Sequence, residues 1–185
     1  MAGIGHNGGP DWNGLAWRKH CWTTARARLL PVLPVEVVRM RVKRAAELGL
    51  DYKTYAGVRA ASGHDVIAFL FSTNALRVDA VARIAAPEAV HLAAITGADR
   101  IALAQSMPPG ALVAANPGAL DRAHVAPRPF ASFAQAAAAL REAMGKLPGD
   151  QVVLVGSDAP WEREWLMAGK LAALLPAERY FARAS

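Results

Sequence analysis

The chain contains one cysteine, Cys21, so it cannot form an internal disulfide bond. Its longest apolar runs are far shorter than the ~18 residues that suggest a membrane span. The N-terminus is glycine-rich and polar, unlike the apolar core of a signal peptide. These absences argue against a secreted disulfide scaffold and against a membrane protein. We expect a cytoplasmic protein with no membrane partner.

Short motifs for phosphate, dinucleotide and metal binding are also missing. No GxxxxGK[ST] loop occurs, and the only glycine-dense segment does not follow a predicted strand. The five histidines are scattered, with no HxH, HExxH or CxxC spacing, and no GxSxG elbow is present. The sequence therefore predicts no metal site, and it leaves any cofactor unknown. Whether the protein is an enzyme stays open.

Positive charge is concentrated in the first third of the chain. Residues 1–60 contain ten Lys and Arg against four Asp and Glu, which accounts for the whole net charge of +6. Such asymmetry favours a polyanionic partner, with DNA or RNA as the first candidate. The plain alternative is that an arginine- and alanine-rich chain is basic without binding anything.

Composition and periodicity divide the 185 residues into three segments. Residues 1–14, with five glycines, are expected to form a flexible tail. Residues 15–63 are expected to form a basic helical segment, with helices at 15–33, 34–49 and 51–63. Residues 64–185 are expected to form an α/β domain, and 15–185 to make one compact unit.

From residue 64 onward, strand-like and helix-like stretches alternate. Strands are expected at 65–71, 100–104, 111–115 and 151–155, with a last one at 179–183. Helices are expected at 76–85, 87–98, 132–145 and 159–175. This order predicts an α/β fold with a mostly parallel, Rossmann-like sheet flanked by helices.

Small polar residues follow four of the predicted strands. In an open α/β sheet, ligands bind outside the carboxyl ends of the strands, so these residues are the candidate ligand site. They are Ser72, Thr73, Asn74, Ser106, Asn116, Gly156, Ser157 and Asp158. Asp158 is the best candidate for a general base, and the helix after it offers free N–H groups to an anion. The alternative is that these residues only form turns and helix caps.

Residues 44–58 resemble the generic helix-turn-helix pattern. Ala45, Gly49 and Tyr55 fall at the positions of the small residue, the turn glycine and the following apolar residue. Arg44 and Gly57 depart from the pattern. The resemblance implies nucleic-acid contacts from a basic set that comprises Arg39, Arg41, Lys43, Arg44, Lys53 and Arg59.

The opening GIGHNGGP, residues 3–10, resembles a leader found on small proteins of alphaproteobacteria and their phages, which implies a lineage and no activity. Three tryptophans, Trp12, Trp17 and Trp22, follow at intervals of five, so one helical face cannot hold them all.

Three functions therefore stay open. The first is a nucleic-acid-associated protein with a possible nucleotide-like ligand at the strand ends. The second is an α/β enzyme or binder of an anionic or phosphorylated small molecule. The third is an interaction subunit that docks on a protein partner through its tryptophan-containing N-terminus.

Overall fold

The computed structural model describes residues 33–182. The predicted tail at 1–14 and the three N-terminal tryptophans lie outside these residues. The chain divides into two compact units, Met1–Val38 and Arg39–Ser185. The second unit contains the sheet and all the residues of the candidate sites.

Two helices joined by a short turn precede the sheet. Helix α2 spans Val35–Glu47 and helix α3 spans Tyr52–Ser62. The turn between them contains Gly49, whose φ of +66° lies in the left-handed region that glycine adopts without strain. Asp51 caps α3, because its side chain accepts a hydrogen bond from the Thr54 N–H at 2.9 Å.

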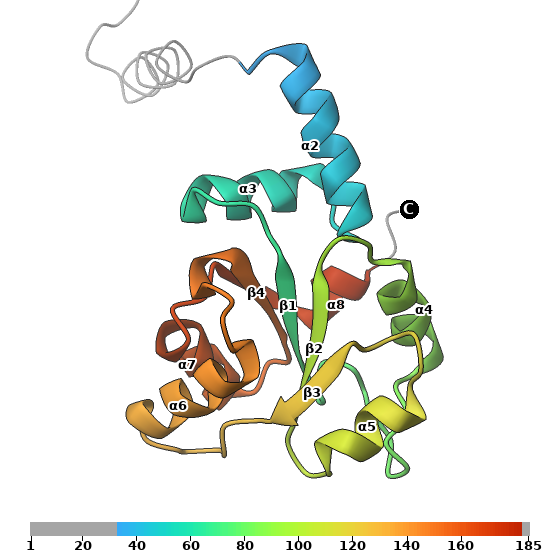
Figure 1. The fold of residues 1–185 in the computed structure, drawn as a ribbon, viewed down its shortest axis with the longest axis vertical. Helices are drawn as coiled ribbons and strands as arrows, with labels where there is room; N and C mark the ends of the chain where they lie inside the picture. Colours follow the sequence, from blue (N-terminus) through green and yellow to red (C-terminus); the bar gives the residue numbers. More distant parts are fainter. Residues whose placement is uncertain (1–32, 183–185) are drawn as a thin grey trace, which may run out of the picture. The chain divides into compact units, whose positions relative to one another are not determined.

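The sheet has five parallel strands in the order β3-β2-β1-β4-β5. Their bounds are β1 Ala68–Ser72, β2 Asp99–Ala104, β3 Arg122–Val125, β4 Val152–Gly156 and β5 Ala173–Pro176. All residues of β1 and β4 are buried, as expected for central strands covered on both faces. The predicted Rossmann-like α/β fold is confirmed (Figure 1).

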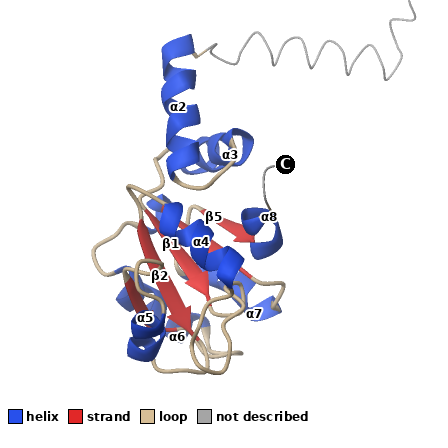
Figure 2. Cartoon of the chain, turned by 90° about the vertical axis from the view of Figure 1, so that its right-hand side faces the viewer, coloured by secondary structure: helices blue, strands red, loops and turns tan. Residues whose placement is uncertain are grey.

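Helices cover both faces of this sheet (Figure 2). They are α4 Ala86–Ala94, α5 Pro109–Ala115, α6 Phe133–Met144, α7 Pro160–Ala168 and α8 Ala177–Phe181, with a 3₁₀ turn at Gly149–Gln151. On one face, Phe69 and Phe71 of β1 pack in a cluster with residues of α4, α5 and α8. On the other, Ala68 and Leu70 pack with residues of α6 and α7. Successive strand residues thus face opposite layers.

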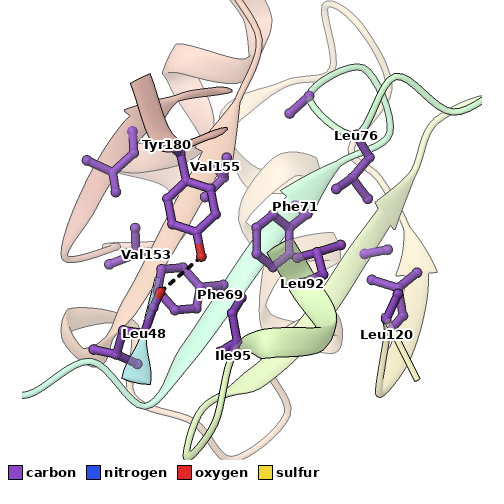
Figure 3. Packing of buried hydrophobic residues seen from close by; sticks show 14 of the residues in the cluster. Leu48, Phe69, Phe71, Leu76, Leu92, Ile95, Leu120, Val153, Val155 and Tyr180 are labelled. Carbon is purple, nitrogen blue, oxygen red and sulfur yellow. Dashed lines mark hydrogen bonds between the residues drawn. The ribbon is translucent and has the colours of Figure 1, made fainter. Parts of the chain in front are cut away.

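Tyr180 of α8 belongs to the same hydrophobic cluster as Phe69 and Phe71 (Figure 3). Its ring is 5.5 Å from that of Phe69 and 5.8 Å from that of Phe71, measured between centroids. Its hydroxyl donates a hydrogen bond of 3.1 Å to the carbonyl of Leu48 in the α2–α3 turn. Burial raises the pKa of this phenol. Tyr180 therefore connects the last helix to the turn that precedes α3.

Two predictions between β1 and β3 are wrong. Residues 111–115 belong to helix α5 rather than to a strand, because Pro108 and Pro109 start a helix in which Leu112 is buried. Residues 76–85 form turns rather than a helix. The Asp79 side chain accepts hydrogen bonds from the N–H groups of Val81 and Arg83, which holds the chain in a non-helical loop.

The prediction near the C-terminus is also wrong. Helix α7 stops at Gly169, Lys170 adopts a φ of +50°, and the chain then enters β5. The helix predicted at 159–175 therefore contains the start of a strand. The described part of 179–183 lies in and just after α8 and forms no strand.

Candidate functional site

Strands β1 and β4 lie side by side in the strand order, and the later strands are added to the sheet in opposite directions on either side of this pair. The chain moves from β1 toward β2 and β3, and from β4 toward β5. In folds of this kind a ligand crevice forms outside the carboxyl ends of the two strands at such a switch point. The residues after β1 and β4, Asn74 and Ser157 among them, lie at this edge.

A buried glutamate, Glu162 of α7, occupies the switch point. Its side chain is fully buried, with 0% exposure. Oε1 accepts hydrogen bonds from Asn74 Nδ2 at 3.0 Å and from Gln105 Nε2 at 2.8 Å. Oε2 accepts one from the Ser157 N–H at 2.6 Å. The Glu162 carboxylate thus accepts hydrogen bonds from three donors that would otherwise be available to a bound anion.

Gly156, at the end of β4, makes room for this carboxylate. A Cβ placed on Gly156 would lie 3.0 Å from Glu162 Oε2 and 3.0 Å from Leu174 Cδ1. That spacing is tighter than ordinary van der Waals contact. The close backbone approach that Gly156 allows is therefore used by Glu162.

Other predicted strand-end residues support the local turns. The Ser72 hydroxyl accepts a hydrogen bond from the Ala75 N–H at 3.1 Å, and the Thr73 hydroxyl accepts one from the Gln105 N–H at 3.2 Å. Both residues are buried. The Thr73 bond joins the loop after β1 to the loop after β2, which positions Gln105 for its bond to Glu162.

Asp158 and Ser157 line a small cavity of about 130 Å³ at the same edge, together with Asn74. Asp158 is exposed, and the Ser157 hydroxyl accepts a hydrogen bond from the Ala159 N–H. Ser106 is exposed and does not line this cavity. The structure therefore brings together Asn74, Ser157 and Asp158 from the predicted set.

Asn116 lies at the C-cap of α5, so the prediction that it follows a strand is wrong. Its carboxamide is buried, accepts from the Ile84 N–H at 2.8 Å, and donates to the carbonyls of Ala82 and Leu112. These bonds fix the loop before α4, which is a structural role.

Arg44 and Arg59, from the predicted nucleic-acid set, contact Asp65. Arg44, with a side chain 20% exposed, donates to Asp65 at 3.0 Å and to the carbonyls of Val66 and Gly97. Arg59 lies 3.7 Å from Asp65. Burial alone would raise the pKa of Asp65, but hydrogen bonds from Tyr55 and Arg44 and the charge of Arg44 lower it. This cluster joins α2 and α3 to the segments that enter β1 and β2.

The other four predicted residues lie at the surface of α2 and α3. Arg39, Lys43 and Lys53 are exposed, and Arg41 is half-buried. Within residues 33–182, no hydrogen bond or ion pair is formed by the side chains of Arg41, Lys43 or Lys53. Helices α2 and α3, which carry these residues, lie at the end of the sheet where β1 begins (Figure 1).

The burial of the two helices is compatible with the helix-turn-helix resemblance and equally with a simple helical cap on the edge of the sheet. Ala45, Leu48 and Leu50 are buried, as are Tyr55 and Val58 of α3. Arg44, the residue that departs from the pattern, is accommodated because Asp65 neutralises it. The exposed part of α3 carries Lys53 and otherwise mostly glycine and alanine, which offer no side-chain hydrogen bonds to bases.

A second cavity, of about 560 Å³, lies between the α2–α3 turn and α8. Its lining includes Asp51, Thr54 and Arg179, and the Arg179 guanidinium donates to the Thr54 hydroxyl at 2.8 Å. It also includes His91, whose Nε2 is buried with no hydrogen-bond partner among the described residues. Burial lowers the pKa of His91, and the backbone of Gly49 partly offsets this shift.

Protonation of His91 is therefore expected to destabilise the protein at acidic pH. Since the folded-state pKa lies below the ordinary value of 6.5, the unfolded state binds more protons, and stability falls as the pH drops below 6.5 toward the folded-state pKa. Denaturant unfolding measured between pH 7.5 and 5.0 checks this. The variant His91→Leu should lose that part of the pH dependence, and parallel curves for the two proteins would contradict the assignment.

Among residues 33–182, no group of three or more His, Cys, Asp or Glu side chains could hold a metal ion. In the same part of the chain, no helix has the length and apolar character needed to cross a membrane.

Comparison of the chain with protein-family models, with curated proteins and with solved structures finds no match. The fold and the site nevertheless define a class of protein. It is a Rossmann-like α/β domain with an added pair of helices at the amino end of the sheet. Its own glutamate fills the position at the switch point where this fold offers hydrogen-bond donors to a ligand.

Proposed function

We propose that this protein binds nucleic acid through phosphate contacts made by basic side chains on α2 and α3. The observation that carries the proposal is the exposure of Lys43 and Lys53, together with the lack of internal partners for them and for Arg41 among the described residues. Cations without internal partners are available to phosphate oxygens, and they release counterions from nucleic acid when they bind. Arg44 and Arg59 have a structural role in this proposal, because both form ion pairs with Asp65 and Arg44 forms a second one with Glu47.

The arrangement of the two helices favours contact with the backbone rather than with the bases. Apart from Lys53, the exposed positions of α3 are mainly small residues such as Gly57, Ala60 and Ala61. Small residues let a helix approach a phosphate backbone closely, but they cannot read donor and acceptor patterns on base edges. We therefore expect binding that depends weakly on sequence and strongly on salt.

The residues at the carboxyl ends of the strands give weaker support to the second hypothesis, the binding of an anionic or phosphorylated small molecule. Glu162 already accepts the hydrogen bonds that an anion would need. The cavity beside it is lined by the carboxylates of Asp158 and Glu178 and by one cation, Arg77. A second negative charge would be repelled there.

The test is a salt titration of the full chain with labelled duplex DNA, single-stranded DNA and RNA of random sequence. The triple variant Arg41→Gln, Lys43→Gln and Lys53→Gln should bind more weakly. On duplex DNA it should reduce the slope of log affinity against log salt by about 2.7, since each phosphate contact contributes roughly 0.9.

A matched triple variant controls for the loss of net charge. Arg141, Lys146 and Arg163 are exposed cations on and near α6 and α7, and their replacement by glutamine removes the same charge from another surface. Unchanged binding by this control is expected. Equal losses in both variants, or no binding of any probe by the wild-type chain at low salt, would overturn the proposal.

A further inference from the structure

A third cavity, of about 580 Å³, lies beside α4 and α8. Glu88 of α4, Glu178 and Phe181 of α8, and Arg77 from the loop after β1 line it. Its other lining residues are alanines and one proline. The nucleic-acid proposal makes no use of this cavity, and it lies apart from the exposed cations of α2 and α3.

Glu88 is the unusual group in this cavity. The residue is 5% exposed, and its Oε2 is buried with no hydrogen-bond partner among the described residues. A buried carboxylate oxygen without a donor costs free energy, and native structures contain few such groups. Its place in the first turn of α4 is favourable to the helix dipole.

Arg77 neutralises Glu88 only loosely. Its Nε lies 3.6 Å from Glu88 Oε1, beyond ordinary hydrogen-bond length, and its side chain is 69% exposed. Arg77 also has a φ of +49°, an uncommon conformation for a residue other than glycine. Its guanidinium thus lies at the edge of the cavity, where another cation could replace it without breaking a short hydrogen bond.

We infer that this cavity binds a small organic cation, whose ammonium or guanidinium group takes the place of Arg77 beside the Glu88 carboxylate. Phe181 offers an aromatic ring, which attracts cations, and Glu178 adds a second carboxylate. The adjoining cavity of about 130 Å³ shares Arg77 and Glu178 with this one and adds Asp158. An aliphatic molecule with a positive group at each end fits this distribution of carboxylates, with one end on Glu88 and the other near Asp158.

Calorimetric titration of the full chain with agmatine and with putrescine tests the inference, with 1,4-butanediol as the uncharged probe. Wild type should bind the two amines and not the diol. Arg77→Gln should bind at least about tenfold more tightly, because the competing internal cation is gone. Glu88→Gln should bind at least about tenfold more weakly.

Three variants and controls keep the result interpretable. Glu88→Gln replaces a loosely paired charge with a neutral amide of nearly the same shape, so we expect it to stay folded. Ala177→Met fills the cavity without changing its charge and should also abolish binding. Glu142→Gln removes an exposed carboxylate of α6 and should change nothing. Failure of both wild type and Arg77→Gln to bind either amine, or wild-type affinity in Glu88→Gln or Ala177→Met, would overturn the inference.

Discussion

Replacement of Glu162 with alanine is expected to destabilise the protein by about 2–4 kcal/mol, because the change removes a fully buried carboxylate and leaves three donors at the rim of the site without their acceptor. The donors are Asn74 Nδ2, Gln105 Nε2 and the Ser157 N–H. For a chain of this size, such a loss lowers the melting temperature by roughly 10 °C. Thermal unfolding followed by circular dichroism measures it.

The same variant should acquire an anion site. The three donors converge on the space that the Glu162 carboxylate leaves, so acetate or formate is expected to raise the melting temperature of Glu162→Ala in proportion to its binding. Wild type and Glu164→Ala, which removes an exposed carboxylate two residues away, should not respond. A melting temperature of Glu162→Ala within 2–3 °C of wild type, or equal effects of acetate on all three proteins, would contradict the role assigned to this residue.

Arg44→Ala is expected to cost about 2–4 kcal/mol, since the guanidinium stabilises three segments at once. It donates to Asp65 Oδ2, to the Val66 carbonyl just before β1 and to the Gly97 carbonyl just before β2. Its loss leaves the Asp65 carboxylate with less positive charge nearby and two carbonyls without their donor. Chemical denaturation should show a lower midpoint.

Lys43→Ala is the matched comparison, because it removes a neighbouring cation of α2 that makes no internal contact in the described chain. We expect it to change stability by less than about 0.5 kcal/mol and to weaken nucleic-acid binding. The opposite result, with Arg44→Ala as stable as wild type and defective only in binding, would show that Arg44 is a phosphate contact.

The central strands could be predicted because a strand covered on both faces is a short apolar run. The runs that end at Phe71, Ala104 and Val155 satisfy this rule and lie in β1, β2 and β4. The same rule misassigned 111–115, since a short apolar run is equally compatible with a buried helix. Pro108 and Pro109, which favour a helix start, were the discriminating signal.

Strand β5 was missed because its four residues continue the apolar pattern of α7. Gly169 and Lys170 interrupt the helix there, but only Gly169 is visible as a break in the sequence. Strand β5 pairs in parallel with β4. No local sequence pattern encodes this pairing between two separate segments.

The edge of the candidate site could be predicted, but the residue at its centre could not. Parallel strands place their carboxyl ends together, which is why Asn74 and Ser157 meet. In the sequence, Glu162 is an ordinary acidic residue in the first turn of a helix. Its burial depends on Gln105, 57 positions away, and on Asn74, 88 positions away. Contacts of that range follow from the fold rather than from spacing.

The bond from Tyr180 to Leu48 has a consequence for the order in which the chain can fold during synthesis. The two residues are 132 positions apart, and Tyr180 also covers Phe69 and Phe71 of the first strand. Until α8 has been synthesised, Phe69 and Phe71 lack their packing against Tyr180, and the α2–α3 turn lacks its hydrogen bond from the Tyr180 hydroxyl. The domain can therefore close only after α8 has emerged, so its native state forms through contacts of long sequence separation.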